Sequence, residues 1–130
     1  MPRILDTPSA PAPIGPYSVA VEANGFVFFS GQVGFDPQTG DRVPDSVDAQ
    51  ARRVLDNIGL ALADVGLDYR DVVKTTVFLA DMADYAKVNE IYATYFGEHP
   101  PARSAIQAGA LPGGFLVEIE VVAAMREGSK

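Results

Sequence analysis

Two segments of the chain place their apolar residues at helical spacing. Across residues 47–65 the apolar positions recur at i, i+4, i+7, i+8, i+11, i+15 and i+18, which is one face of a helix. Asp45 or Ser46 is suited to cap its start, and Gly66 follows its end. Residues 85–96 form a second such segment. Its apolar face, which we expect to be core, carries Tyr85, Val88, Tyr92, Tyr95 and Phe96.

Strand-like runs flank these two predicted helices. Residues 17–34 hold two apolar runs joined by Asn24-Gly25, a pair that favours a hairpin turn because both positions accept a positive φ. Further strand patterns lie at 72–79, 102–108 and 115–124. The Pro-rich residues 1–16 precede them as an extended arm that packing orders at least in part. The order predicts an α+β, two-layer domain: a mixed sheet of about six strands with both helices on one face.

Both faces of the predicted sheet are partly apolar. In the last strand, one face carries Phe115, Val117, Ile119 and Val121, and the other carries Leu116, Glu118, Glu120 and Val122. The strand at 72–79 divides into Val73, Thr75, Val77 and Leu79 against Val72, Lys74, Thr76 and Phe78. Helices on one face leave the other apolar face uncovered, and such a patch usually marks an interface. We therefore expect a homo-oligomer, with Glu118 at or near a subunit boundary.

Composition narrows the classes of function. A length of 130 residues predicts one domain, 1–130. The chain has no cysteine and one histidine, His99, which excludes thiolate chemistry and disfavours a Ser-His relay or a multi-histidine metal site. The net charge of −7 opposes binding to nucleic acid or to anionic membranes. No signal peptide or membrane span is apparent, so we expect a cytoplasmic protein whose last residues, 126–130, are solvated.

Arg103 and Glu118 are the charged residues that stand out, because each lies in a largely apolar strand pattern. A guanidinium is always charged and can bind a carboxylate through two parallel hydrogen bonds, so Arg103 is a candidate carboxylate receptor. A carboxylate in a partly apolar cleft is suited to act as a general base, which is the role that Glu118 could fill. An ion pair and a solvent-facing strand residue are the simpler interpretations. Glu120 shares the face of Glu118, and chemistry alone does not choose between them.

Four other polar or glycine positions are weaker candidates. Tyr17 follows Gly15-Pro16, and Ser30 precedes Gly31, where a glycine would let a ligand approach a backbone N–H. A strand start and an ordinary turn are the simpler interpretations of these residues. Asn89 lies on the tyrosine-rich face of the second helix, where a buried structural hydrogen bond is the simpler interpretation.

Several short motifs, taken together, resemble the Rid/YjgF family of reactive intermediate deaminases over residues 12–124. They occur in the family's order: "APIGPYS" (12–18), "SGQVG" (30–34), "QARRVLDNIGLALADVG" (50–66), "VVKTTVFLADMADYAKVNEIYATYF" (72–96), "PPARS" (100–104) and "LPGGFLVEIE" (111–120). The resemblance implies a chorismate-mutase-like α+β sandwich that assembles as a homotrimer with clefts between subunits. It also implies hydrolysis of 2-imino acids, or of enamine tautomers such as 2-aminoacrylate, to 2-keto acids and ammonium, with no cofactor and no metal.

The resemblance also implies roles for particular residues. Arg103 of the P-A-R motif would bind the substrate carboxylate, helped by the backbone N–H of Gly31. Glu118, the first glutamate of V-E-I-E, would position or activate the attacking water. We therefore expect Arg103 and Glu118 to lie together on the sheet face that the trimer closes. Tyr17 and Ser30 would line the cleft and orient the substrate.

Two further residues, Asn89 and Ala105, lie at positions where the family carries site residues. Asn89 matches the family's V-N motif and would support the site. Many members carry a cysteine two residues after the arginine, but this chain has Ala105 there, so only its backbone could contact the ligand.

Three other functions remain open at this point. A non-catalytic module that binds small carboxylates such as 2-keto acids would use the same residues, although it would have little need of Glu118. An RNA-cleaving translation inhibitor is disfavoured by the charge of −7 and the single histidine. A deaminase or hydrolase step in a dedicated catabolic pathway is the third.

Overall fold

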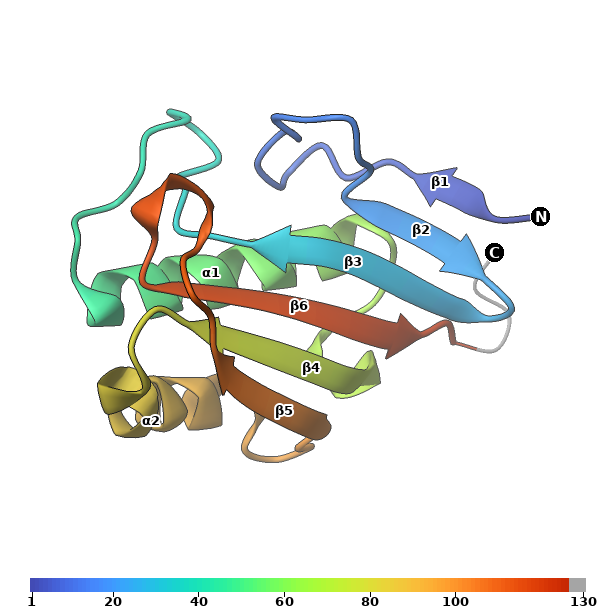
Figure 1. Ribbon diagram of the computed structural model, residues 1–130. Helices are drawn as coiled ribbons and strands as arrows, with labels where there is room; N and C mark the ends of the chain where they lie inside the picture. The colour runs from blue at the N-terminus through green and yellow to red at the C-terminus, as the bar shows by residue number, and fades with distance from the viewer. Residues whose placement is uncertain (127–130) are drawn as a thin grey trace.

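The computed structural model describes residues 1–126 and places six strands in one mixed sheet (Figure 1). The strand order is β1-β2-β3-β6-β4-β5, and only the β4–β5 pair is parallel. The strands are β1 (Arg3–Leu5), β2 (Ala20–Ala23), β3 (Phe26–Gln32), β4 (Val72–Leu79), β5 (Ala102–Gln107) and β6 (Val117–Ala124). The predicted α+β class and the sheet of about six strands are confirmed.

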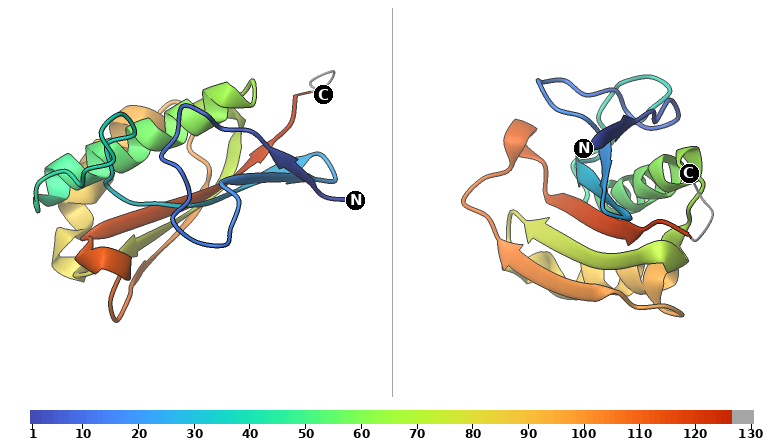
Figure 2. Two further views of the ribbon diagram at one scale, coloured as in Figure 1. Left: turned by 90° about the horizontal axis from the view of Figure 1, so that it is seen from above. Right: turned by 90° about the vertical axis from the view of Figure 1, so that its right-hand side faces the viewer.

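Two helices cover one face of this sheet and leave the other face open (Figure 2). Helix α1 (Val47–Asp64) begins at Ser46, whose hydroxyl accepts a hydrogen bond from the Ala49 N–H at 3.3 Å. Gly66 follows the helix with a φ of +81°, as expected for a glycine after a helix end. Helix α2 (Tyr85–Phe96) ends at Gly97, as the sequence predicted.

The N-terminal half of the sheet is built from a tight hairpin and an added edge strand. Asn24 and Gly25 have φ values of +53° and +83°, so both adopt the left-handed conformation that this turn requires. Part of the Pro-rich arm is ordered, as expected, because β1 pairs with β2 in antiparallel register. This pairing supplies the sixth strand.

The core lies between the sheet and the two helices. Phe115, Val117, Ile119 and Val121 are all at most 2% exposed, as the alternation in this strand predicted. The prediction for β4 was wrong at its start: Val72 is buried and Val73 is 41% exposed. A register shift between Val72 and Lys74 in the pairing with β6 reverses the alternation there.

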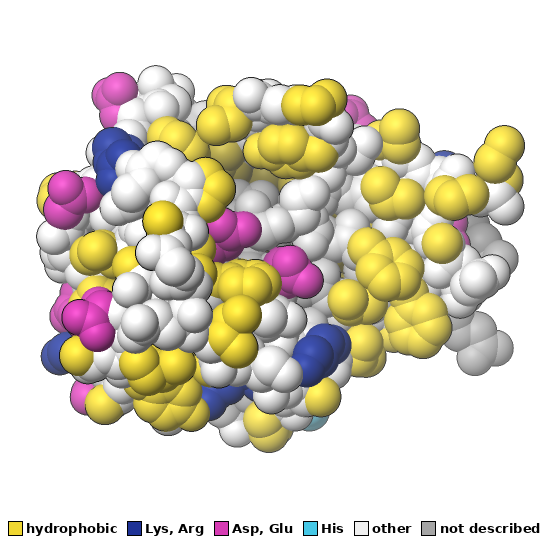
Figure 3. Space-filling model, in the orientation of Figure 1, with side chains coloured by type: hydrophobic (Ala, Val, Ile, Leu, Met, Phe, Trp, Pro, Cys, Tyr) yellow, Lys and Arg dark blue, Asp and Glu magenta, His cyan; other side chains and the backbone are white. Residues whose placement is uncertain are grey.

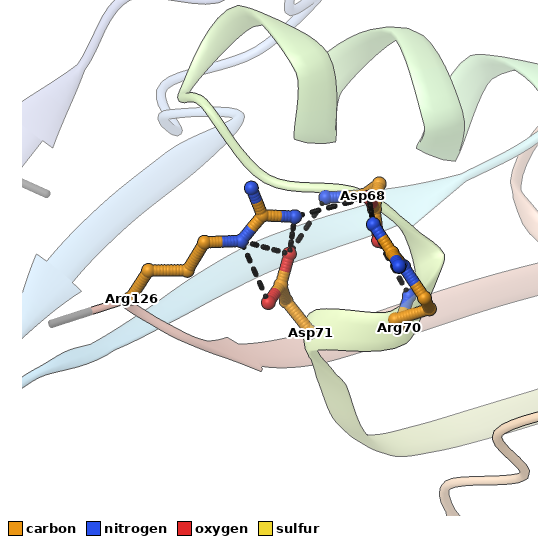
Figure 4. A network of polar contacts seen from close by, with 4 residues as sticks. All are labelled: Asp68, Arg70, Asp71 and Arg126. Carbon is orange, nitrogen blue, oxygen red and sulfur yellow. Dashed lines mark hydrogen bonds and ion pairs between the residues drawn. The ribbon is translucent and has the colours of Figure 1, made fainter.

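The end of β6 is tied to the short 3-10 turn η1 (Tyr69–Asp71) by charged side chains (Figure 4). Arg126 is exposed to solvent, as expected, and its guanidinium also binds Asp71 at 2.8 Å and Asp68 at 3.0 Å. Residues 127–130 of that expected tail lie outside the described residues. A hydrogen bond from the Arg70 side chain is the largest cause that holds the pKa of Asp68 well below its usual range.

Within residues 1–126, neither helix has both the length and the apolar composition needed to cross a bilayer.

Candidate active site

A pocket of about 300 Å³ opens where β3, β6 and the N-terminal arm meet. Glu118 projects into it from β6, opposite the buried side chains of Val117 and Ile119. Three other predicted residues, Tyr17, Ser30 and Gly31, also line this pocket. The structure therefore brings four of the predicted site residues together on the open face of the sheet.

Gly31 allows the Glu118 carboxylate to lie directly against the backbone of β3. The register between β3 and β6 shifts between Phe29 and Gln32, which places Gly31 in an irregular part of the strand. A Cβ added at Gly31 would collide with Oε2 of Glu118. The glycine is therefore required by the carboxylate itself, and not only by the approach of a ligand.

The other two residues of this pocket are held mainly through their backbones. The Ser30 N–H donates to the Val19 carbonyl at 2.9 Å, and the Ser30 hydroxyl donates to the Ser18 carbonyl at 2.7 Å. The Ser30 hydroxyl proton is thus engaged, which leaves the oxygen as an acceptor in the pocket. Tyr17 lies at the end of a tight turn, in which its N–H donates to the Gly15 carbonyl at 2.9 Å. Tyr17 is 47% exposed.

The Glu118 carboxylate has no hydrogen-bond partner among residues 1–126, and the residue is half-buried. Burial, followed by repulsion from the nearby Glu120 carboxylate, raises the pKa of Glu118 above its ordinary value. Both causes disfavour the charged form. A carboxyl group with a raised pKa accepts a proton more readily at neutral pH, as a general base requires.

The rim of this pocket includes residues that sequence reasoning missed. Phe35 and Pro112 line it, and the Phe35 ring packs edge-on against Phe115 at 5.0 Å between ring centroids. Arg42 lies over the Phe115 ring at 4.1 Å and donates to the Gly113 carbonyl. These contacts attach the turn at 112–114 to the loop that precedes α1. An exposed arginine in a turn-rich loop carries no pattern that predicts this role.

Arg103 lies on β5, and its guanidinium is bound by side chains of α2. One Nη donates to Asn89 Oδ1 at 2.6 Å, and the other donates to the Tyr85 hydroxyl at 2.7 Å. The guanidinium carbon also lies 4.9 Å from the centroid of the Tyr92 ring. Beside it is a hollow of about 220 Å³ that is lined partly by Pro100 and Pro101 of the preceding loop.

Two expectations about α2 were wrong. Asn89 is exposed and not buried, and its partner is Arg103. Tyr85 was assigned to the core but is 39% exposed, because its position at the first turn of α2 carries it past the sheet edge to Arg103. Tyr92 and Phe96, about two and three turns further on, are buried as expected.

The expectation that Arg103 and Glu118 share the open face was also wrong. Arg103 pairs with Thr75, which is fully buried on the helix side of β4. Neighbouring partners in a sheet point to the same face, so Arg103 points toward α2, and so does Ala105 two residues on. Glu118 faces the other way, and β4 lies between the two strands that carry these residues. One chain thus presents Arg103 and Glu118 on opposite faces of the sheet.

The open face carries both charge and apolar surface (Figure 3). Acidic side chains lie near its middle, and apolar side chains gather toward the right-hand ends of β3 and β6. Phe26 and Phe28, at the start of β3, are 43% and 48% exposed. Among residues 1–126, no three His, Asp or Glu side chains are grouped so that they could hold a metal ion.

Comparisons with known proteins agree with this architecture. The model of the family described as Endoribonuclease L-PSP matches residues 7–125. The 2-iminobutanoate/2-iminopropanoate deaminase of Mus musculus is 51% identical over 121 residues, which cover 93% of this chain and 90% of that protein.

Solved structures of similar chains show the same fold. A putative endoribonuclease L-PSP from Entamoeba histolytica has a TM-score of 0.92 at 42% identity, covering 96% of this chain and 100% of that one. E. coli TdcF, with serine bound, has a TM-score of 0.88 at 40% identity, covering 95% and 99%.

The chain belongs to the Rid/YjgF family, as its sequence motifs predicted. The similarity to the mouse protein over most of both chains agrees with the predicted class of deaminase.

Proposed function

We propose that this protein hydrolyses reactive 2-imino acids, and enamine tautomers such as 2-aminoacrylate, to 2-keto acids and ammonium. The reaction takes place in clefts between the subunits of a homotrimer, with no cofactor or metal. Arg103 binds the substrate carboxylate, and Glu118 activates the attacking water. The observation that carries this proposal is the contrast between a firmly held guanidinium and an unpartnered, half-buried carboxylate with a raised pKa.

The chemistry asked of these residues is modest, because an imine carbon is already electrophilic. With the imine nitrogen protonated, water adds to C2 while Glu118 takes one of the water protons, which gives a neutral carbinolamine. Glu118 then returns that proton to the nitrogen, the C–N bond breaks, and the carbinolamine hydroxyl loses its proton to form the keto group. The departing ammonia takes up this last proton and leaves as ammonium. A positioned general base typically contributes about 10²–10⁴-fold to such a step.

The remaining site residues bind and orient the substrate. The Gly31 N–H adds a donor for the substrate carboxylate, and Tyr17 and Ser30 orient the rest of the molecule. Asn89 holds Arg103, and the backbone at Ala105 contacts the ligand. The name of the mouse relative supports the substrate class, and the bound serine of TdcF is a small molecule with a carboxylate.

The placement of Arg103 and Glu118 supports the proposed trimer. Because Arg103 and Glu118 point to opposite faces of one sheet, they can act on one small substrate only if the β5 edge of one copy meets the open face of another. Such a contact joins two different surfaces, and repeated head-to-tail contacts close into a ring, of which three copies make a compact example. Exposed apolar residues such as Phe28 and Ile106 would be buried in this assembly.

The word endoribonuclease in the family description suggests a different substrate, but this chain is poorly suited to RNA. Its net charge of −7 disfavours the phosphate contacts that give most nucleic-acid affinity. Its single histidine, His99, lies on an exposed loop, and its side chain makes no hydrogen bond or ion pair among residues 1–126.

A coupled assay tests the proposal. An amino-acid oxidase generates 2-imino acids, semicarbazide traps what remains, and a loss of semicarbazone signal reports hydrolysis. We expect the wild-type protein to compete with the trap, and light scattering to give three times the chain mass of 13.8 kDa.

Two results would overturn the proposal. A monomer that is fully active would exclude a cleft between subunits. A wild-type trimer that hydrolyses no imino acid from the panel of oxidase substrates, yet binds 2-keto acids in calorimetry, would indicate the non-catalytic carboxylate-binding module instead.

A further inference from the structure

The Tyr85 hydroxyl lies beside Arg103 with an unusual hydrogen-bonding role. It is 2.7 Å from an Nη of Arg103, and the guanidinium carbon lies 5.5 Å from the centroid of the Tyr85 ring. The ring is therefore beside the guanidinium and not stacked closely on it. The main contact of Tyr85 with Arg103 is made by its hydroxyl group.

The direction of this hydrogen bond is fixed by chemistry. A guanidinium has only N–H donors, so the Tyr85 oxygen must be the acceptor. The hydroxyl proton of Tyr85 is then directed elsewhere, and no group among residues 1–126 accepts it. Tyr85 is 39% exposed, so part of this residue is in contact with solvent.

Both tyrosine and arginine therefore present hydrogen-bond donors to the same small region. Arg103 gives one N–H to Asn89 and one to Tyr85, which leaves three of its five N–H groups. Because the Nη and the phenol oxygen are 2.7 Å apart, one carboxylate oxygen placed on the side that both donors face can lie within hydrogen-bond reach of both.

We propose that Tyr85 is a substrate-binding residue whose O–H donates a hydrogen bond to the carboxylate held by Arg103. This inference rests on the proposed function, because it takes Arg103 to be the carboxylate receptor. Phenylalanine at this position would keep the ring and lose the donor. Tyr85 thus makes the site more selective for substrates with a free carboxylate over the corresponding amides.

The test compares Tyr85→Phe with wild type in the full chain. Titration calorimetry with 2-oxobutanoate measures carboxylate binding, and the imine assay separates KM from kcat. We expect Tyr85→Phe to weaken 2-oxobutanoate binding roughly tenfold, as for loss of one hydrogen bond to a charged group. KM should rise by a similar factor while kcat changes less than twofold, because the bond is made equally in the bound substrate and the transition state.

Tyr95→Phe is the matched control. Tyr95 lies on the same helix, and its hydroxyl bonds to Asp56 at 2.8 Å, away from Arg103. This variant also loses one hydroxyl from α2, and it should bind 2-oxobutanoate as wild type does.

A spectroscopic measurement separates direct contact from mere support of Arg103. A phenol that donates a hydrogen bond to a carboxylate absorbs at longer wavelength, so 2-oxobutanoate should produce a tyrosine difference spectrum in wild type. The signal should persist in Tyr95→Phe and vanish in Tyr85→Phe. If Tyr85→Phe binds weakly but wild type gives no such signal, Tyr85 only supports Arg103 and the inference is wrong.

Arg103→Ala, titrated in parallel, separates a failure of the inference about Tyr85 from a failure of the proposed function. If Arg103→Ala loses binding while Tyr85→Phe binds as wild type does, only the inference about Tyr85 fails. If Arg103→Ala binds 2-oxobutanoate as wild type does, the proposed function fails and the inference fails with it. The same holds if 2-oxobutanoate does not bind to the wild-type protein.

Discussion

Arg103 and Glu118 differ in how the fold surrounds them. Arg103 is bound by Asn89 at 2.6 Å and Tyr85 at 2.7 Å, and it lies over the Tyr92 ring. The Glu118 carboxylate has no hydrogen-bond partner among residues 1–126, and its nearest neighbours are the bare backbone of Gly31 and a second carboxylate, Glu120.

This difference matches two different tasks. A binding group works best when its position is fixed before the ligand arrives, because little conformational freedom is then lost on binding. A proton acceptor needs a suitable pKa, and partners that stabilise the charged form would lower the pKa of a carboxyl group. The side chains around Arg103 fix the position of its guanidinium. Glu118 lacks such partners, so nothing lowers the pKa of its carboxyl group in this way.

Arg103→Ala tests the binding half and should have the largest effect. Two hydrogen bonds to a charged carboxylate, at about 2 kcal/mol each, correspond to a loss of roughly 10³-fold in kcat/KM. Most of this loss should appear as a higher KM in the coupled assay. Arg52→Ala, which removes an exposed arginine from α1, is the charge-matched control. A loss below tenfold for Arg103→Ala would contradict a role as the main carboxylate receptor.

Glu118→Gln tests the proton-transfer half. The amide keeps the shape of the side chain but cannot take a proton from water, so kcat should fall by about 10²-fold, within the usual contribution of a general base. KM should change only slightly. Glu90→Gln, an exposed glutamate of α2, makes the same change in net charge and should remain active. If Glu118→Gln raises KM and leaves kcat unchanged, Glu118 contributes to substrate binding and not to proton transfer, contrary to the proposal.

Gly31→Ala tests whether the position of Glu118 matters. The added Cβ would displace the Glu118 carboxylate, because the two cannot occupy the same space. We expect kcat to fall about tenfold, since small misplacements of a catalytic group are costly. Gly109→Ala is the control, because a Cβ there meets nothing within 4 Å. Full activity in Gly31→Ala would show that Glu118 acts from another position.

Glu120→Gln tests the cause of the raised Glu118 pKa and should have the smallest effect. Glu118 must be deprotonated to act as a base, so activity falls as the pH drops through its pKa. Removing the Glu120 charge removes the second cause of the raised pKa and leaves burial, the larger one. The acidic limb of the kcat/KM profile should therefore move to lower pH, with little change on the plateau. A limb that stays in place would exclude Glu120 as a contributor.

The sequence by itself determined the elements and what each element offers. Helical and strand periodicity, the Asn24-Gly25 turn and the caps at Ser46 and Gly66 are local signals, because they depend on residues only a few positions apart. The same local alternation placed Glu118 opposite the buried residues Val117 and Ile119. The family motifs then selected Arg103 and Glu118 among many charged residues.

Only the tertiary structure decided how these residues meet. Whether Arg103 shares a face with Glu118 depends on the register of β5 against β4, which residues far apart in the chain set through packing. The register shift near Val73 reversed one predicted face for the same reason. The contacts of Gly31 with Glu118, and of Tyr85 with Arg103, join different elements. Local periodicity holds no information about such contacts, because they arise only when the elements pack together.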